Sequence, residues 1–301
     1  IETHLPPPLA TCRVSQEAPL ASEFECLRTA RDALHAKGAE RLKVVVDHPH
    51  LDASYAEGMA ALGIPWLTFS QSSHPPGPPN WVVSPLTAQE QGSEGEGSHT
   101  HWLRGPAFTV LRPIFREGCP HAYRPLSERR RLLVTFGGGS DFGASGRLLP
   151  PILEAFPELE IQVITTRSND SLPRIEALVG QFGGRLKLTV EPEEIAVPMC
   201  EAGAAVTAGG TTTVELAALG IPFITVAIAG NQEMPSKAWE DRGVSLHAGN
   251  LQSEAVTEQV LTHLRRLLGD PEECLERSQR ALECVDGLGA QRILSHLFEE
   301  V

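Results

Sequence analysis

The chain has 301 residues, of which 41% are hydrophobic and 21% charged, and its formal net charge is -13 at pH 7. This length suggests two domains or one large one, and the composition is that of a globular protein. The negative charge argues against nucleic acid as a partner, because phosphate contacts require a surplus of Lys and Arg. It also disfavours electrostatic docking on an anionic membrane. Residues 129–131 are the only dense basic run, and they are read as a solvated turn before a strand, although a local basic patch can still serve one phosphate group.

No stretch of the sequence has the ~18 apolar residues that span a bilayer, and no signal-peptide pattern is present. The six cysteines are scattered and none forms a C-x-x-C pair, so neither a zinc site nor a redox motif is indicated. We therefore expect a cytoplasmic protein with no integral membrane segment, in which the cysteines are reduced thiols. They are Cys12, Cys26, Cys119, Cys200, Cys274 and Cys284.

Helices and strands are predicted to alternate in the first part of the chain, as is typical of a parallel α/β sheet. Apolar residues recur at helical spacing in two segments, and short apolar or β-branched runs indicate three strands. The predicted helices are residues 23–37 and 52–62, and the predicted strands are residues 42–47, 64–69 and 81–83. Residues 1–22 are read as irregular, and residues 70–100 are rich in Pro and Gly and read mostly as loop.

A second α/β pattern begins at Arg131. The predicted strands are residues 132–136, 161–165, 186–190, 204–207 and 222–226. The predicted helices are residues 146–156, 172–182, 195–202, 212–219, 236–241, 254–268 and 271–285. Pro150 and Pro151 are expected to bend or restart the first of these helices. The Pro-containing segment 118–127 predicts a boundary between an N-terminal domain, residues 1–122, and a C-terminal domain, residues 123–301.

Two Gly-rich loops each follow a predicted strand and precede a predicted helix. The first comprises Gly137, Gly138, Gly139 and Ser140, and the second comprises Gly209, Gly210 and Thr211, followed by Thr212. A helix N-terminus offers unpaired backbone N–H groups, and glycines let a pyrophosphate approach the backbone. In open α/β sheets, ligands bind beyond the carboxyl ends of the strands, where both loops are expected. One such loop can be only a tight turn, but two in one half of the chain favour a phosphate site.

Three further polar residues are expected at the same edge of the sheet. Glu215 lies four residues after Thr211 on the same predicted helix, where a carboxylate can accept hydrogen bonds from ribose hydroxyls. The alternative is a solvent-facing acid that interacts with the helix dipole. Asn231 and Gln232 follow the next strand, and their amides can bind sugar or phosphate, or serve as a turn residue and a cap.

These segments resemble a known superfamily. Residues 208–222, with the sequence AGGTTTVELAALGIP, followed by residues 230–232, resemble the C-terminal half of GT-B nucleotide-sugar enzymes, which include the peptidoglycan N-acetylglucosaminyltransferases. The closer resemblance is to the UDP-2,4-diacetamido-2,4,6-trideoxy-β-L-altropyranose hydrolases of pseudaminic acid synthesis and their spore-coat polysaccharide relatives. Further similar segments are residues 46–52, 103–113, 134–141 and 285–292.

The resemblance implies two Rossmann-like domains with parallel sheets that face each other across a cleft, with UDP held mainly by the C-terminal domain. It places the second Gly-rich loop on the diphosphate, Glu215 on the ribose and Asn231 at the sugar. The implied reaction is attack of water on the anomeric carbon, which releases UDP and a free sugar. The resemblance implies no metal or other cofactor, so backbone amides and helix dipoles must stabilise the diphosphate charge.

The N-terminal half departs from the family pattern. The family begins with a strand and a G-x-G-H-x-x-R loop, and we expect this first strand–loop–helix unit to be missing here, since the chain begins with Ile1 and has no such motif. The family's D-x-Y motif reads Asp47, His48, Pro49 in this chain. His48, and less strongly His50, is the local substitute for a catalytic base, because imidazole exchanges protons near neutrality. Asp47 either orients a His, contacts the sugar or caps the next helix.

Three functions are compatible with these observations. The first is a UDP-sugar hydrolase, in which Asp47, His48 and Asn231 are the candidate catalytic residues. The second is a GT-B glycosyltransferase with a UDP-sugar donor, which also needs an acceptor surface. The third is a non-catalytic paralogue that only binds a nucleotide sugar, which the missing His and Tyr motifs favour. In each case the expected partner is a UDP-sugar.

Overall fold

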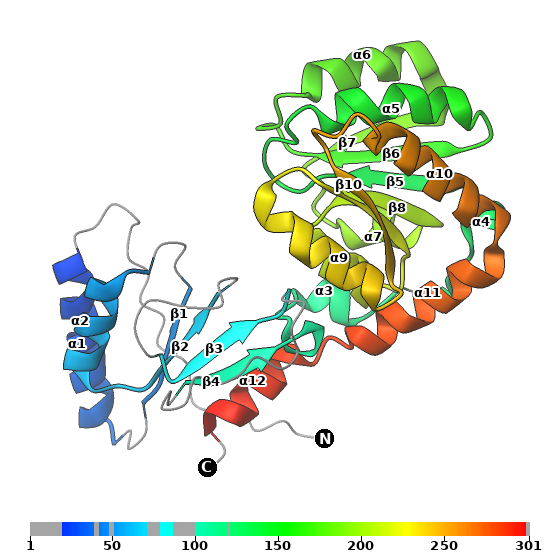
Figure 1. The fold of residues 1–301 in the computed structure, drawn as a ribbon. Coiled ribbons are helices and arrows are strands. Elements are labelled where there is room, and N and C mark those ends of the chain that lie inside the picture. The colour runs from blue at the N-terminus through cyan, green and yellow to red at the C-terminus, as the bar shows by residue number, and fades with distance from the viewer. Residues whose placement is uncertain are drawn as a thin grey trace. The chain divides into compact units, whose positions relative to one another are not determined.

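The structure is a computed structural model that describes residues 20–38, 42–47, 51–70, 79–86, 100–119 and 121–298. Contacts between Cα atoms divide the chain into two compact units (Figure 1). The first comprises Ile1–Ser84 and Gly92–Leu103, and the second comprises Pro85–Gln91 and Arg104–Val301. Each unit has a sheet with parallel strands and covering helices, so the predicted α/β class with two Rossmann-like domains is confirmed. The domain boundary predicted between residues 122 and 123 stays a prediction.

The first unit contains a four-stranded sheet and two helices. The strands are β1 (Val44–Val46), β2 (Trp66–Phe69), β3 (Trp81–Ser84) and β4 (His101–Arg104), in that order, and the helices are α1 (Leu20–Ala36) and α2 (Ala53–Leu62). The first three strands pair in parallel. Phe24, Tyr55 and Trp66 belong to its small apolar core. A Cβ on Gly58 would lie 2.2 Å from the ring of Phe24, so glycine allows α1 and α2 to pack closely.

The second unit is built on a six-stranded sheet in the order β10-β9-β8-β5-β6-β7, and its neighbouring strands pair in parallel. The strands are β5 (Arg131–Thr135), β6 (Glu160–Thr165), β7 (Leu186–Val190), β8 (Ala204–Ala208), β9 (Phe223–Ala227) and β10 (Ser245–Asn250). The chain runs outward from β5 to β7 and then returns to β8 on the other side of β5. The direction of winding therefore reverses between β5 and β8, which is the switch point where ligands bind in such sheets.

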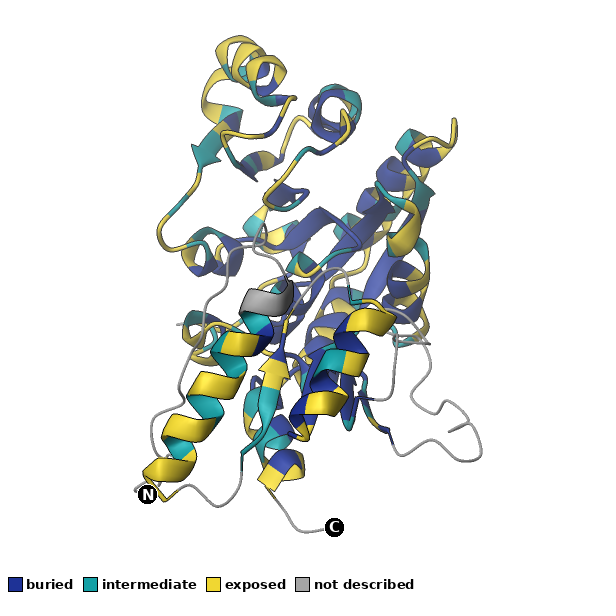
Figure 2. Ribbon diagram, turned by 90° about the vertical axis from the view of Figure 1, so that its left-hand side faces the viewer, coloured by how far each residue is buried: buried dark blue, intermediate teal, exposed yellow. Residues whose placement is uncertain are grey.

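Helices cover both faces of this sheet. The helices of this unit are α3 (Pro113–Arg116), α4 (Leu126–Arg129), α5 (Ala144–Ala155), α6 (Leu172–Phe182), α7 (Ala196–Cys200), α8 (Thr212–Ala218), α9 (Glu233–Asp241), α10 (Val256–Gly269), α11 (Pro271–Cys284) and α12 (Gly289–Phe298), with short turns η1 (Pro106–Phe108), η2 (Gly183–Arg185) and η3 (Gly230–Gln232). Leu132 and Val134 pack with residues of α5, α6 and α10, whereas Leu133 packs with residues of α7, α8 and α9. Because both faces are covered, the central strands β5, β8 and β9 are almost wholly buried, whereas most residues of the outer strand β7 are only partly buried or exposed (Figure 2). In the described parts of the chain, no helix is long and apolar enough to cross a membrane.

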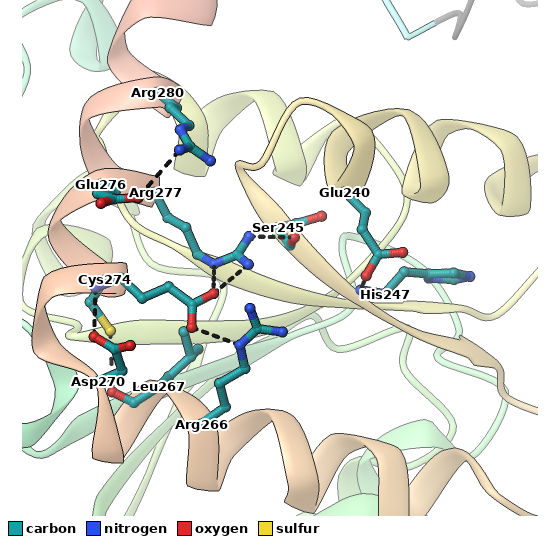
Figure 3. Close-up of polar contacts among 11 residues, drawn as sticks. Glu240, Ser245, His247, Arg266, Leu267, Asp270, Cys274, Glu276, Arg277 and Arg280 are labelled. Carbon is teal, nitrogen blue, oxygen red and sulfur yellow. Dashed lines mark hydrogen bonds and ion pairs between the residues drawn. The ribbon is translucent and has the colours of Figure 1, made fainter.

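Strand β10 and helices α3, α4 and α12 of this unit were not predicted. Strand β10 carries Ser, His, Gly and Asn, which weaken the strand pattern, and it forms at the edge of the sheet because α9, α10 and α11 hold it there. The guanidinium group of Arg277 on α11 donates to the carbonyl oxygen of Ser245 at 2.8 Å and is paired with Glu273 (Figure 3). Helix α12 packs on η1, where a Cβ on Gly289 would lie 2.2 Å from the carbonyl oxygen of Thr109. Despite Pro150 and Pro151, α5 is one continuous helix.

The expectation of reduced cysteines is wrong for Cys26, Cys119 and Cys200, which are disulfide-bonded. Cys119 and Cys200, separated by 81 positions, form a disulfide between the segment before α4 and the end of α7. The sequence contains no local C-x-x-C signal because the two residues meet only through the tertiary fold. In the simplest model, a cross-link that closes a loop of this length lowers the entropy of the unfolded chain and so stabilises the fold by about 4.5 kcal/mol. Cys274 is a buried free thiol.

Candidate functional site

The structure brings the two Gly-rich loops together at the carboxyl ends of the strands of the second sheet. Strands β5 and β8 are direct neighbours, and Thr135 pairs in register with Thr207. The first loop follows β5 and the second follows β8, so they lie on either side of the switch point. Asn231 and Gln232 belong to η3, which follows the neighbouring strand β9 at the same edge. The sequence-predicted residues of the C-terminal half therefore gather where a parallel sheet places its ligands.

The first loop is held in place by a buried carboxylate. The side chain of Asp141, 1% exposed, accepts hydrogen bonds from the backbone N–H of Gly143 at 2.9 Å and of Ser145 at 3.0 Å, and from the hydroxyl group of Ser171. Burial acts to raise the pKa of this carboxyl, but the hydrogen bonds from Ser145 and Ser171 outweigh it and hold the pKa below its ordinary value. Backbone donors at the start of α5 are thus already bound within the protein.

Two further polar groups of the first loop also have partners in the protein. The hydroxyl group of Ser140 donates to Asp170 at 2.7 Å, and the carbonyl oxygen of Gly138 accepts from Thr166 at 3.1 Å. Both partners lie on the connection between β6 and α6. Gly138 and Gly139 are exposed, and Gly137 and Ser140 are partly exposed. The predicted contact of these four residues with a phosphate stays a prediction, and the structure shows a loop tied to its neighbour.

The two glycines of the second loop differ in their surroundings. A Cβ on Gly209 would lie 2.3 Å from the hydroxyl oxygen of Ser236 and 2.7 Å from the carbonyl oxygen of Gln232, so no other residue fits there. A Cβ on Gly210 would meet only the side-chain nitrogen of Gln232, at 3.9 Å. The lack of a side chain at Gly209 therefore allows the loop to pack against η3 and α9. At Gly210, by contrast, the lack of a side chain leaves open space next to the backbone.

Unpaired hydrogen-bond donors converge at this open space. In the part of the chain that the structure describes, no group accepts a hydrogen bond from the backbone N–H of Gly210, Thr211 or Thr212, whereas the next N–H, of Thr213, is bonded to the carbonyl oxygen of Gly210 at 3.1 Å. The side-chain oxygen of Gln232 accepts from the N–H of Ile228 at 3.1 Å, which turns its NH₂ group toward Gly210. Since α8 has only seven residues, these donors matter more than its dipole. Such a set of donors suits an anion.

Glu215 lies on α8, one turn after these donors. Its side chain is 19% exposed and accepts a hydrogen bond at 3.1 Å from Arg112, whose side chain is 59% exposed. Burial raises the pKa of the Glu215 carboxyl, and Arg112 opposes this increase only in part. A mostly buried acid whose charge is incompletely compensated is a common feature of functional sites. Arg112, which sequence reasoning did not select, lies in the segment 103–113 that carried part of the family resemblance.

We expect Glu215→Gln to stabilise the folded protein near neutral pH while weakening binding of UDP. Because the pKa of Glu215 is raised on folding, this group lowers stability increasingly as pH rises through its folded pKa, and the neutral amide removes that effect. Thermal unfolding at pH 7 and below pH 4 measures the difference between variant and wild type, which should vanish at the acidic end. Glu240→Gln, on the exposed side of α9, is the control. A lower melting temperature for Glu215→Gln at pH 7 would contradict this interpretation.

A buried polar layer supports η3 and the start of α9. His247 on β10 lies 3.1 Å from the hydroxyl group of Thr225 and 3.4 Å from the carboxylate of Glu233, the residue after Gln232. Thr207 and Thr225 are register partners, and so are Thr225 and His247. Sequence reasoning missed this layer, although a Thr at or next to the end of each predicted strand was a usable signal. The layer fixes the segment that carries Asn231 and Gln232.

Replacing Gly209 by alanine should destabilise the protein by about 1–3 kcal/mol, the usual effect of overpacking. The added methyl group would overlap the carbonyl oxygen of Gln232, which belongs to the backbone and cannot rotate away. Urea denaturation followed by circular dichroism measures the change in free energy of unfolding. The double variant Gly209→Ala/Ser236→Gly lacks the hydroxyl group of Ser236, which is the atom nearest to the added methyl group. It should therefore recover part of the lost free energy of unfolding. Unchanged stability of Gly209→Ala would show that the close packing is wrong.

The candidate residues of the N-terminal unit are described only in part. Asp47 is exposed and directly follows β1. His48 and His50 lie outside the described residues. The carboxylate that caps α2 is Asp52, which accepts a hydrogen bond from the N–H of Tyr55 at 2.9 Å, so the capping role considered for Asp47 belongs to Asp52. The catalytic roles of Asp47, His48 and Asn231 stay predictions.

Comparison with known proteins finds both sequence relatives and similar solved structures. No protein-family model matches the chain. It is 28% identical over 289 residues to the UDP-N-acetylglucosamine–N-acetylmuramyl-(pentapeptide) pyrophosphoryl-undecaprenol N-acetylglucosamine transferase of Alkalilimnicola ehrlichii, covering 90% of this chain and 76% of the relative. It is 24% identical to the spore coat polysaccharide biosynthesis protein SpsG of Bacillus subtilis, covering 67% of this chain and 60% of that protein. The crystal structure of MurG from Acinetobacter baumannii superimposes with a TM-score of 0.61 at 18% identity, covering 92% of this chain and 77% of MurG.

Proposed function

Since the chain has the fold of the GT-B superfamily, we propose that it is a glycosyltransferase that uses a UDP-sugar as donor. The observation that supports this most directly is the set of unpaired donors at Gly210, Thr211, Thr212 and Gln232, directly beside the mostly buried carboxylate of Glu215. The first relative is named as an N-acetylglucosamine transferase. That name favours transfer over the hydrolysis that the sequence resemblance suggested.

In this proposal, the second Gly-rich loop binds the diphosphate. The N–H groups of Gly210, Thr211 and Thr212 and the NH₂ group of Gln232 donate to its oxygens. When the bond between the anomeric carbon and the diphosphate breaks, negative charge grows on the leaving oxygen. Donors fixed in position before the reaction stabilise this charge without reorganisation, which lowers the barrier. The acceptor hydroxyl forms the new bond to the anomeric carbon, and its proton passes to a base.

Glu215 is assigned to the nucleoside. Its carboxylate lies one helical turn beyond the donors and is held by Arg112, so that one oxygen is oriented by the ion pair and the other is available to ribose hydroxyls. Asn231, an exposed residue of η3, is assigned to the sugar. We leave the base assigned to His48, with Asp47 beside it, as the sequence analysis predicts. Uridine itself is taken from the relatives' names and from the family resemblance.

Calorimetric titration with UDP, together with an assay of UDP-N-acetylglucosamine breakdown, tests the proposal. We expect UDP to bind and the UDP-sugar to be consumed slowly in the absence of an acceptor. Rapid release of free sugar in water would favour the hydrolase instead. Binding of UDP with no breakdown of the UDP-sugar, both without an acceptor and with acceptors that carry a sugar hydroxyl, would favour a non-catalytic paralogue. Absence of UDP binding to the folded protein would overturn the site itself.

A further inference from the structure

A basic pocket lies at the amino ends of the strands of the second sheet, opposite the carboxyl ends that carry the Gly-rich loops. It has a volume of about 450 Å³ and is lined by His121, Ala122, Arg124, Arg129, Arg131 and Glu201. Arg131 is the first residue of β5, and Glu201 precedes β8. The Gly-rich loops follow the carboxyl ends of the same two strands. At ~3.3 Å per residue, the length of β5 therefore separates the pocket from the donors of the proposed nucleotide site by roughly 15 Å.

The arginines of this pocket are not fully neutralised by the protein. Arg131 is paired with Glu201 and, at 3.4 Å, with Glu160. Among the described residues, no carboxylate lies within ion-pair distance of Arg124 or Arg129. Arg129 donates instead to the carbonyl oxygen of Cys200. Positive charge is thus concentrated in one pocket of a chain whose formal net charge is -13.

The electrostatic environment of Arg129 shows that these charges influence one another. The pKa of its guanidinium group is lowered, first by burial and then by the nearby charges of Arg124 and Arg131. Like charges held together raise the free energy of the empty pocket, and an anion between them would relieve the repulsion. Arginine is also the side chain whose planar fork best matches the oxygens of a phosphate group.

The walls of the pocket are fixed by covalent and polar contacts. The disulfide between Cys119 and Cys200 joins the two segments that carry His121 and Glu201. His121 lies 3.1 Å from the carbonyl oxygen of Cys200, and the hydroxyl group of Tyr123 donates to the carbonyl oxygen of Gly203 at 2.7 Å. A pocket held in this way loses little conformational entropy when a ligand binds.

We propose that this pocket binds the phosphate or pyrophosphate group of a small molecule, at a site separate from the one proposed for the nucleotide sugar. Arg124 and Arg129 would bind the anion directly, and Arg131 would contribute from its ion pairs with Glu160 and Glu201. The volume lies in the range of small-molecule sites and exceeds what a single phosphate needs, so the ligand carries a further group beyond its charged end.

Calorimetric titration of the full chain with inorganic pyrophosphate tests this site. We expect binding to the wild type and at least about tenfold weaker binding to Arg124→Gln, which removes a charge-assisted contact without breaking an ion pair of the protein. Arg265→Gln is a control for the loss of one exposed arginine charge elsewhere, although it also breaks an ion pair with Glu258, and it should leave the affinity unchanged. Arg129→Lys keeps the positive charge but loses the planar guanidinium group, and it should weaken binding by a smaller factor than Arg124→Gln does.

Three further outcomes distinguish pyrophosphate binding in this pocket from binding at the nucleotide site, from a general effect of charge and from binding of a lipid headgroup. Gly210→Ala, which alters the proposed nucleotide site, should bind pyrophosphate at the pocket as the wild type does, so failure of one site does not imply failure of the other. Equal weakening in Arg124→Gln and Arg265→Gln would mean a general effect of charge and would overturn the proposal. Absence of pyrophosphate binding to the wild type, with binding only to vesicles that contain phosphatidic acid, would also overturn it in favour of a lipid headgroup.

Discussion

Replacing Asp141 by alanine is expected to lower the free energy of unfolding by on the order of 3–5 kcal/mol, the cost of breaking a buried charged network. The carboxylate is 1% exposed and accepts hydrogen bonds from Gly143, Ser145 and Ser171. Its removal leaves buried donors at the start of α5 without an acceptor. Urea denaturation at pH 7 measures the loss.

The pH dependence of this effect has a definite sign. Because hydrogen bonds hold the pKa of folded Asp141 below its ordinary value of 3.8, the stabilisation is fully present above pH 3.8 and is lost as pH falls through the folded pKa. The difference between wild type and Asp141→Ala should therefore shrink in acid. Asp170→Ala is the control, since this exposed carboxylate contacts the same loop through Ser140 and should cost less than about 1 kcal/mol. Equal effects of the two variants would contradict the structural role of Asp141.

Replacing Gly210 by alanine should weaken UDP binding by about tenfold to a hundredfold, as expected for the loss of one hydrogen bond to a charged group. The added methyl group would occupy the space beside the unpaired N–H groups of Gly210, Thr211 and Thr212. It would meet the protein only at the side-chain nitrogen of Gln232, 3.9 Å away, so the fold should accommodate it. Calorimetric titration with UDP and thermal unfolding of the same preparation measure both quantities.

The comparison with other glycines sharpens this prediction. Gly180→Ala lies on the exposed face of α6 with nothing within 4 Å of the new Cβ, so it should stabilise the helix by roughly 0.5–1 kcal/mol and leave UDP binding unchanged. Gly209→Ala should instead lower stability. If Gly210→Ala binds UDP as tightly as the wild type, the N–H donors at the start of α8 do not bind the diphosphate. If it unfolds as readily as Gly209→Ala, the space beside Gly210 is not open.

The sequence by itself determined the two α/β units and the position of the Gly-rich loops. Alternation of short apolar or β-branched runs with helical spacing predicted β5 to β9 within one or two residues. The central strands β5, β8 and β9 are buried on both faces and therefore consist almost wholly of apolar residues. The same pattern placed residues 137–140 and 209–211 at the carboxyl ends of strands. It could not find β10, whose Ser, His and Asn are stable in an edge strand only through contacts with α9 and Arg277.

Only the tertiary structure distinguished the two loops and joined residues distant in the chain. By composition the loops are alike, yet Asp141 accepts hydrogen bonds from Gly143 and Ser145 at the start of α5. At the start of α8, by contrast, the N–H groups of Gly210, Thr211 and Thr212 have no acceptor among the described residues. The disulfide between Cys119 and Cys200, the pair of Arg112 with Glu215 and the basic pocket around Arg124 each join segments about 80 to 100 positions apart. The spacing of apolar residues along the chain indicates whether a segment is a helix or a strand. A contact between distant segments depends on the order of the strands in the sheet, which no local sequence pattern encodes.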